Sequence, residues 1–311
     1  MNIRRRHLIL GASGFLGRHL FSCLGPASAI ATYHSAPLEG GVHFDATTTR
    51  LRDVLLRGRH GIATAFLLYG VTQLDACARD PDGTRRVNVD SMVQVIDDLL
   101  EAGVKPIYAS SDAVFDGSRG RWTEDDAPNP SLTYGKQKAA VERYLTGKSP
   151  PWIIARLSKI VGSDTDARSL LGEWVRQIEA GESIRCATDL VFTPAHVDDA
   201  AAALIDLADG EFSGIFNICG PQSMSRMALL QTLIQEVRRY RDFVPRVVGC
   251  SIRDFPFLEP RPLDGSMLPD KLNVALGRSL RDMRSVCADL ARKRYGESLG
   301  VEGANDPNRT S

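Results

Sequence analysis

The sequence predicts an α/β protein: a doubly wound parallel sheet with a second, smaller α/β lobe built from later segments. Three observations support this prediction. A glycine-rich turn directly follows an apolar run near the N-terminus, strand-like and helix-like segments alternate through the first half of the chain, and this alternation stops afterwards. Alternating segments of this kind form parallel sheets that helices cover on both faces. A chain of 311 residues has room for both lobes.

The first strand is expected at 7–10, and the turn after it carries the strongest signal. Residues 11–17 read Gly-Ala-Ser-Gly-Phe-Leu-Gly, a GxxGxxG pattern, before a helix expected at 15–24. Glycines there allow a tight turn and let a pyrophosphate approach the N–H groups at the helix start. A purely structural turn is the alternative, but the flanking strand and helix favour a dinucleotide site in a Rossmann domain. The residues assigned to it here are Gly11, Ser13, Gly14, Phe15, Leu16 and Gly17.

The other elements of the first lobe follow from short apolar runs and from helical periodicity. Strands are expected at 29–33, 42–44, 62–68, 107–109 and 152–157. Helices are expected at 50–57, 82–101 and 134–145, the last two closed by Gly103 and Gly147.

The pattern changes in the second half of the chain. Helices are expected at 170–179 and 227–239, whereas 243–269 is rich in proline and is expected to be irregular. We therefore predict a dinucleotide-binding domain at 1–162, to which 191–220 return, a substrate-binding lobe formed by 163–190 and 221–300, and a disordered tail at 303–311.

Composition narrows the partners and the location. Lys plus Arg and Asp plus Glu number 38 each, so no charge excess favours nucleic acid or an anionic membrane. Six scattered cysteines without a CxxC pair indicate reduced thiols, and six histidines without HxH or HxxxH spacing indicate no metal site. Arg4 to Arg6 could pass for an export signal, but the apolar run behind them ends at Gly11. A cytoplasmic protein is expected, without a membrane span.

A YxxxK motif supplies candidate catalytic residues. Tyr134 and Lys138 would lie one turn apart on the same face of a helix. A tyrosine that exchanges a proton with a carbonyl or alcohol oxygen has a free pKa of about 10, and a nearby ammonium is expected to lower it. Ser111, at the end of the strand 107–109, could hydrogen-bond the same oxygen; capping a turn is the alternative.

A second YxxxK pair is interpreted as accidental. It consists of Tyr144 and Lys148, and Gly147 lies between them, where the helix is expected to end. The two side chains therefore need not share one face.

Several longer stretches resemble one family. Residues 108–117 read Tyr-Ala-Ser-Ser-Asp-Ala-Val-Phe-Asp-Gly, similar to the STDYVFDG stretch of dTDP-4-dehydrorhamnose reductases, in the extended branch of the short-chain dehydrogenase/reductase superfamily. The resemblance runs from residue 7 to about residue 290. Further matching segments lie at 123–126, 128–136, 156–158, 194–199, 214–220 and 261–272.

The resemblance implies a function and further site residues. It implies reduction of a keto group on a nucleotide-linked deoxysugar, with Ser111 at the position of the family's catalytic threonine, Tyr134 as general acid and Lys138 as its partner. Asn88 would lie near the nicotinamide, or be an ordinary surface residue; Asp45 would contact adenine, or cap a loop. The other cofactor residues expected are Tyr33, His34, Tyr69 and Gly70.

The end of the second strand indicates the cofactor. NAD-selective sites place an acidic residue there, to bind the ribose 2′-hydroxyl. Residues 31–35 read Ala-Thr-Tyr-His-Ser and contain no acid, which favours NADPH while leaving NADH open.

Three departures from the family pattern fall on residues expected to contact the substrate. Ala113 replaces a tyrosine, Lys159 replaces an aromatic residue, and Phe192 adds bulk in the segment 189–195. With Asp112 and Arg261 they form the expected substrate site, which would suit a differently decorated keto-sugar. A reductase of a non-sugar carbonyl is one alternative. Another is a non-catalytic regulatory subunit, because the beta subunits of methionine adenosyltransferase resemble this family; a homodimer is left open.

Overall fold

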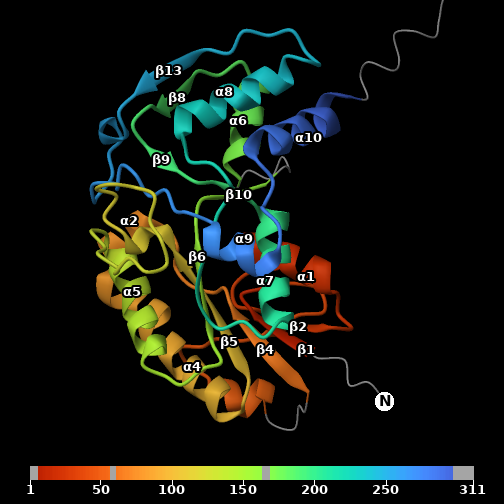
Figure 1. Cartoon of the computed structure of the whole chain (residues 1–311), viewed down its shortest axis with the longest axis vertical. Coiled ribbons are helices and arrows are strands. Elements are labelled where there is room, and N and C mark those ends of the chain that lie inside the picture. The colour runs from red at the N-terminus through yellow and green to blue at the C-terminus, as the bar shows by residue number, and fades with distance from the viewer. Residues whose placement is uncertain (1–5, 57–60, 163–168, 297–311) are drawn as a thin grey trace, which may run out of the picture.

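A seven-stranded parallel sheet forms the first lobe of the computed structural model, which describes residues 6–56, 61–162 and 169–296 (Figure 1). Each strand pairs in parallel with its neighbours. In spatial order the strands are β11 (Gly214–Ile218), β6 (Ile153–Leu157), β5 (Lys105–Ser111), β4 (Ile62–Leu67), β1 (Arg6–Leu10), β2 (Ala29–Tyr33) and β3 (Val42–His43). The predicted fold class is confirmed.

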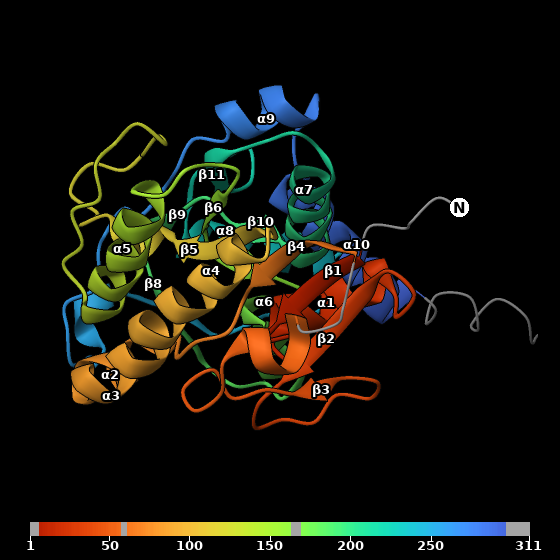
Figure 2. The same ribbon diagram turned by 90° about the horizontal axis from the view of Figure 1, so that it is seen from below.

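Helices cover both faces of this sheet (Figure 2). One face carries α1 (Phe15–Leu24), α7 (Val197–Asp209) and α9 (Asp270–Leu276). The other carries α4 (Ser91–Glu101), α5 (Thr133–Thr146) and the short η1 (Arg52–Leu56). The small helices α2 (Leu74–Arg79), α3 (Pro81–Arg85) and η2 (Arg86–Asp90) lead into α4. Because α7 presents several alanines to the sheet, its backbone can pack closely against α1 and the strands.

The second lobe has a core of its own. It combines α6 (Leu170–Glu179), α8 (Arg226–Val237) and α10 (Met283–Tyr295) with the parallel pair β8 (Ile184–Ala187) and β13 (Val247–Cys250). Trp174, Leu233 and Leu290 are buried at its centre. Two further strand pairs are short. β7 (Ile160–Val161) pairs in parallel with β10 (Ala195–His196), and β9 (Val191–Phe192) pairs antiparallel with β12 (Met224–Ser225).

The structure corrects some predicted elements. The segment 243–269 is not wholly irregular, because β13 pairs with β8 there and the turn η4 (Ile252–Asp254) follows. The helix expected at 50–57 corresponds to the short η1 over 52–56, and residue 57 lies outside the described residues. The predicted tail at 303–311 also lies outside the described residues. The lobe boundaries stay a prediction, although Leu272 of α9, within 221–300, packs into the core of the first lobe.

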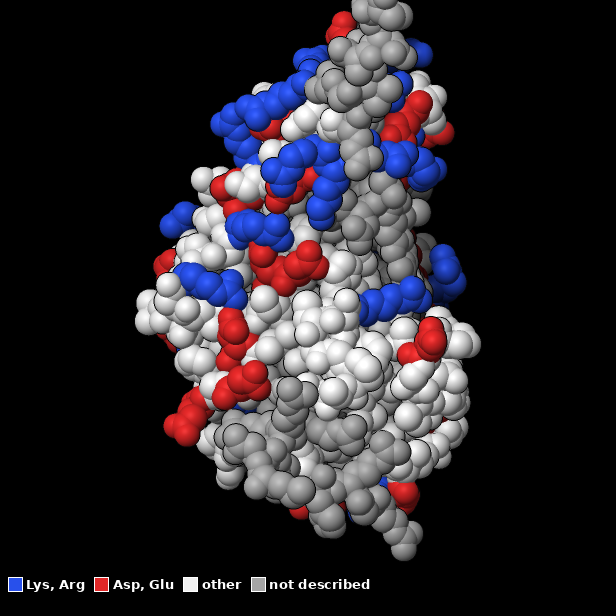
Figure 3. Space-filling model, turned by 90° about the vertical axis from the view of Figure 1, so that its right-hand side faces the viewer, with Lys and Arg blue, Asp and Glu red and all other residues white. Residues whose placement is uncertain are grey.

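The surface carries paired charges. Figure 3 shows Lys and Arg side chains gathered over the second lobe, where α10 contributes several cations. Arg284, Arg292 and Arg294 form ion pairs with Glu236, Asp289 and Glu179. Each of these three arginines therefore has a carboxylate partner.

Membrane spans and the state of the cysteines can be checked on the described residues. Among those residues, no helix combines the length and the apolar character that a membrane span requires. All six cysteines are described, and all are free thiols.

A single lysine ties the carboxyl end of α7 to the sheet. Lys105, the first residue of β5, donates from Nζ to the carbonyl oxygens of Leu207 and Gly210 at 3.0 Å each, and of Phe212 at 3.2 Å. A helix ends with unpaired carbonyls and a partial negative charge, which an ammonium satisfies. The turn that returns the chain to β11 is therefore anchored on β5.

We expect Lys105→Met to destabilise the fold, because three buried or half-buried carbonyls lose a charged donor. The loss should be about 1–2 kcal/mol in the free energy of unfolding. Chemical denaturation measures it, with Lys136→Met, an exposed lysine of α5, as the matched control. Equal stability of the two variants would contradict the anchoring role.

Candidate active site

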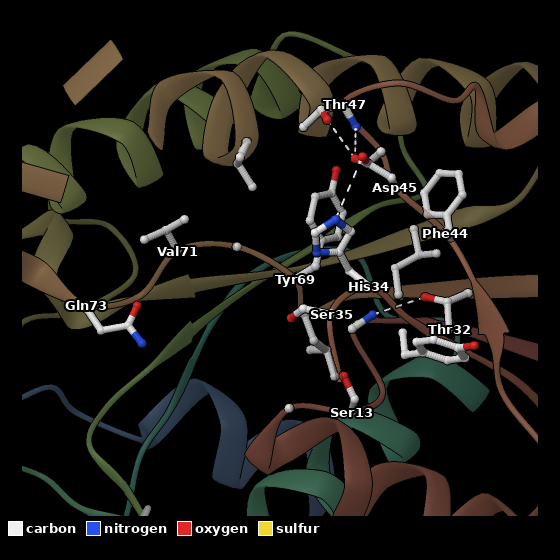
Figure 4. A pocket seen from close by; sticks show the side chains of 18 residues that line it. Ser13, Thr32, His34, Ser35, Phe44, Asp45, Thr47, Tyr69, Val71 and Gln73 are labelled. Atoms are coloured by element: carbon white, nitrogen blue, oxygen red, sulfur yellow. Dashed lines mark hydrogen bonds and ion pairs between the residues drawn. The ribbon is translucent and has the colours of Figure 1, made fainter. Parts of the chain in front are cut away.

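A pocket of about 430 Å³ lies at the carboxyl edge of the sheet, where β1, β2 and β4 end. Small molecules bind in cavities of this size, and ligands of open α/β sheets bind at this edge. Figure 4 shows Ser13 at one end of the pocket and Asp45, joined to Thr47 and His34, at the other. The predicted cofactor residues that line it are Gly11, Ser13, Gly14, Tyr33, His34, Asp45, Tyr69 and Gly70.

The glycines of the first turn have different structural roles. Gly11 has a φ of +90°, and a Cβ there would lie 2.8 Å from the Tyr69 nitrogen. A Cβ at Gly17 would lie 2.4 Å from the Gly11 carbonyl oxygen, so the helix can pack on its own turn only with glycine. Gly14 precedes α1 in extended backbone, and a Cβ would meet only the Gly11 oxygen, at 3.3 Å. The turn thus crowds Gly14 less than Gly11 or Gly17. Close approach of a pyrophosphate to Gly14 stays a prediction.

Thr32, in the pocket wall, holds this turn, and no sequence motif points to it. Its Oγ1 accepts from the Gly11 N–H at 3.3 Å, and its carbonyl oxygen accepts from the Ala12 N–H at 2.8 Å. Phe15 and Leu16 do not line the pocket. The Phe15 ring packs where a Cβ of Gly162 would be, and Leu16 packs on the core. Their contact with a cofactor stays a prediction.

At the far end of the pocket, Asp45 is held in its charged form. Thr47 donates to Asp45 Oδ1 from its N–H at 2.9 Å and from its hydroxyl at 2.6 Å. These hydrogen bonds lower the pKa of Asp45, and His34, whose Nε2 lies 3.8 Å from Oδ2, lowers it further. The carboxylate therefore both caps a local turn and lines the pocket; its contact with adenine stays a prediction.

Asn88 is buried, so the alternative of an ordinary surface residue is wrong. Its Oδ1 accepts from the Val71 N–H at 2.7 Å, and its Nδ2 donates to the Val71 carbonyl at 2.9 Å and to Gln137 Oε1 at 2.7 Å. A Cβ at Gly70, which has a φ of +149°, would lie 2.8 Å from Asn88 Oδ1. Asn88 thus ties a wall of the pocket to α5, between Tyr134 and Lys138. Its contact with a nicotinamide stays a prediction.

Tyr134 and Lys138 are both buried on α5. Lys138 Nζ donates to the Ala109 carbonyl at 2.7 Å and lies 5.6 Å from the centroid of the Tyr134 ring. Burial lowers the pKa of Lys138 to about 8. The pKa of Tyr134, by contrast, is raised, first by burial and then by the Asp112 charge, although a hydrogen bond with Ser111 lowers it. The expected lowering of the Tyr134 pKa is therefore wrong, and the phenol stays protonated at neutral pH.

The start of α5 packs directly on the turn η3 (Asp112–Val114). A Cβ at Gly135 would lie 2.0 Å from the Ala113 carbonyl oxygen, so only glycine allows this approach. Ser111 Oγ donates to Asp112 Oδ1 at 2.9 Å and accepts from the Ala113 N–H at 3.2 Å. Burial raises the pKa of Asp112 to about 6. Gly135 thus brings Tyr134 close to Ser111, a role that the YxxxK pattern alone does not reveal.

Three of the predicted substrate residues differ in burial and in partners. Lys159 is exposed; partial desolvation and the Arg226 guanidinium lower its pKa, whereas Asp112 raises it. Phe192 is only 5% exposed and packs in the core of the second lobe, which leaves little of it for a ligand. Arg261 donates to Asp75 Oδ1 at 2.6 Å, and its guanidinium lies 4.2 Å from the centroid of the Phe257 ring. All three stay predictions as substrate contacts.

A buried ion pair lies beneath the site. Arg156 Nη2 of β6 donates to Glu142 Oε2 of α5 at 2.9 Å, and Ser110 Oγ of β5 donates to Glu142 Oε1. The Glu142 carboxylate also raises the pKa of Lys138, against the larger effect of burial. Sequence reasoning assigned no role to Glu142.

The second YxxxK pair meets at the other edge of the sheet. Asp97 Oδ1 accepts from the Tyr144 hydroxyl at 2.6 Å and from Lys148 Nζ at 3.1 Å. The two side chains thus lie together despite Gly147, but about three turns of α5 away from Tyr134. Within the described ranges, no group of His, Cys, Asp and Glu side chains could hold a metal ion.

Curated proteins similar to this chain include two reductases and a subunit of a methionine adenosyltransferase. The probable low-salt glycan biosynthesis reductase of Haloferax volcanii is 27% identical over 225 residues, 70% of this chain and 75% of that protein. The dTDP-4-dehydrorhamnose reductase of Aggregatibacter actinomycetemcomitans is 26% identical, over 69% of this chain and 78% of that protein. The methionine adenosyltransferase 2 subunit beta of Bos taurus is 25% identical, over 71% of this chain and 69% of that protein.

Solved structures share the fold. A hypothetical dTDP-4-dehydrorhamnose reductase of Sulfolobus tokodaii aligns with a TM-score of 0.78 at 23% identity, covering 89% of this chain and 98% of that one. The dTDP-4-dehydrorhamnose reductase of Bacillus anthracis in complex with NADP aligns with a TM-score of 0.78 at 20% identity, covering 95% and 99%. The family model described as the RmlD substrate binding domain matches residues 5–295. The chain therefore belongs to the RmlD substrate binding domain family.

Proposed function

We propose that this protein is an NADPH-dependent reductase of a keto group on a nucleotide-linked sugar. The observation that carries the proposal is the junction between the pocket and α5. Asn88 joins Val71 of the pocket wall to Gln137, so the buried Tyr134 and Lys138 lie beside a site suited to a dinucleotide. The names of the similar reductases support the substrate class.

The residues of the chain suit proton transfer to a carbonyl oxygen. When bound, the reduced nicotinamide would supply the hydride to the carbonyl carbon. Tyr134 would donate its hydroxyl proton to the oxygen, while Ser111 hydrogen-bonds the same oxygen and stabilises its developing charge. The raised pKa of Tyr134 keeps the acid protonated beforehand, and the Lys138 ammonium would stabilise the phenolate that remains.

The pocket supports NADPH, with NADH left open. Its lining at the end of β2 consists of Thr32, Tyr33, His34 and Ser35, without the acid that binds a ribose 2′-hydroxyl and repels a 2′-phosphate. A solved relative contains NADP, and the similar structure of MoeE5 contains NAD together with UDP-glucose. Isothermal titration with each dinucleotide, followed by NADPH oxidation with a panel of keto-sugar nucleotides, tests the proposal.

A regulatory subunit is the second candidate. The 25% identity with methionine adenosyltransferase 2 subunit beta favours it, whereas the retained Ser111, Tyr134 and Lys138 favour catalysis. Co-purification with a partner enzyme, without turnover of any keto-sugar nucleotide or other carbonyl compound, would support the regulatory role.

Tyr134→Phe is expected to remove nearly all turnover, because the hydroxyl is the proton donor, while the dissociation constant for NADPH changes by less than about threefold. Steady-state kinetics and isothermal titration measure the two quantities. A kcat close to that of the wild type on the true substrate would show that another group is the acid.

The kcat is expected to fall as the pH rises through about 8, because Lys138 loses the charge that stabilises the phenolate. Lys138→Arg should move this limb to higher pH, because a guanidinium stays protonated. A profile whose alkaline limb is the same in wild type and variant would assign the titration to a different group.

dTDP-4-dehydrorhamnose is expected to be a poor substrate, because Ala113 and Lys159 remove a tyrosine and an aromatic wall that the family has. Two lost contacts would lower kcat/KM by about a hundredfold relative to the natural substrate. Comparison of kcat/KM across the panel measures the difference. Efficient reduction of dTDP-4-dehydrorhamnose, near about 10⁵ M⁻¹s⁻¹, would show that these substitutions are neutral.

A further inference from the structure

Residues 251–261, here called the strap, connect the second lobe to two helices of the first. At its start, Ser251 Oγ and the Ile252 N–H donate to Asp189 beside β8. Toward its end, the Leu258 N–H and Arg261 both donate to Asp75 of α2, at 3.2 and 2.6 Å. In Figure 1 the chain descends from β13 to the neighbourhood of α2. Both ends of the strap are therefore fixed by carboxylates.

The strap also supplies the N-terminal cap of α5. The residue before this helix, Leu132, has no side-chain acceptor. Instead the Thr133 N–H donates to Glu259 Oε1 and Oε2 at 3.0 and 3.1 Å, and the Thr133 hydroxyl donates to Oε1 at 2.7 Å. A helix N-terminus has unpaired N–H groups and a partial positive charge, so a carboxylate satisfies both.

The capped residue directly precedes Tyr134. In the first turn of α5, Glu259 thus holds Thr133, and the Ala113 backbone packs on Gly135. Tyr134 lies between them in sequence. Because its hydroxyl must face a carbonyl oxygen within hydrogen-bonding distance, a small rotation of this turn would misplace it.

The contact at Arg261 steadies the cap. Its side chain is only 10% exposed, and its guanidinium lies over the Phe257 ring while bonding Asp75. Glu259 lies between Phe257 and Arg261 in sequence, so its backbone is held on both sides. The carboxylate can therefore reach Thr133 at small additional cost in conformational entropy.

We propose that Glu259 is a positioning residue: from the second lobe, its carboxylate fixes the first turn of α5 and thereby the direction of the Tyr134 hydroxyl. This inference rests on the proposed function, because it assigns the orientation of the proposed general acid to a residue 125 positions away in sequence. Asp75 and Arg261 serve the same end by holding the strap.

Glu259→Ala and Glu259→Gln test the proposal, with Glu182→Ala, an exposed carboxylate of the second lobe, as control. Glu259→Ala is expected to lower kcat about tenfold while the NADPH dissociation constant changes by less than about twofold. Glu259→Gln should restore most of kcat, because its carboxamide oxygen still accepts from the Thr133 N–H. Amide hydrogen exchange over residues 133–137 should be faster in Glu259→Ala alone.

Other outcomes would overturn the proposal. An unchanged kcat in Glu259→Ala would do so. A variant in which kcat, NADPH affinity and melting temperature all fall together would also do so, because that result would mark a merely structural residue. If the wild type reduces no keto-sugar nucleotide, the proposed function fails; unchanged exchange at the start of α5 would then also refute the cap, whereas faster exchange confined to that turn would support it.

Discussion

The buried ion pair between Glu142 and Arg156 is the constraint on which the candidate site depends. It joins α5 to β6, and Ser110 extends it to β5, while the Arg156 guanidinium lies over the Phe115 ring. A lone charge at this depth would be strongly destabilising, so helix and strands must come together with both partners in place. The depth of Tyr134 and Lys138, and hence their altered pKa values, follows from this docking of α5.

Much of the first lobe could be predicted because local patterns determine it. Buried parallel strands are continuous apolar runs, and the close approaches at Gly11 and Gly17 tolerate no side chain, so the sequence displays both. Local sequence patterns predict the second lobe less well. The strand β13 begins two residues after Pro245 and contains Gly249, and its partner β8 lies about 60 residues earlier in the chain. In α7 most of the buried residues are alanines, with Leu204 and Leu207 among them, so the contrast between its inner and outer faces is weak in the sequence.

The candidate site divides in the same way. Residues on the turn after β1 and on α5 are found from spacing, because spacing along one element fixes geometry. Phe192 could not be placed, because the pairing of β9 with β12 turns it into a core that no local pattern reveals. Thr32, Glu142 and Glu259 act through partners on other elements. Their roles depend on tertiary contacts, and a single sequence does not show which distant groups meet.

The interleaving of the two lobes has a consequence for how the chain can fold during synthesis. The core of the second lobe is formed by α6, α8 and α10. Between α6 and α8 in sequence, however, the chain forms α7 and β11, which belong to the first lobe: β11 is a strand of the large sheet, and α7 packs on that sheet. The apolar face of α6 must therefore wait for α8, and α8 in turn packs on α10, the last helix to be made. During synthesis on the ribosome, the strands β1 to β6 can assemble while the apolar surfaces of the second lobe are still exposed. The second lobe therefore stays prone to aggregation until α10 has been made and has docked.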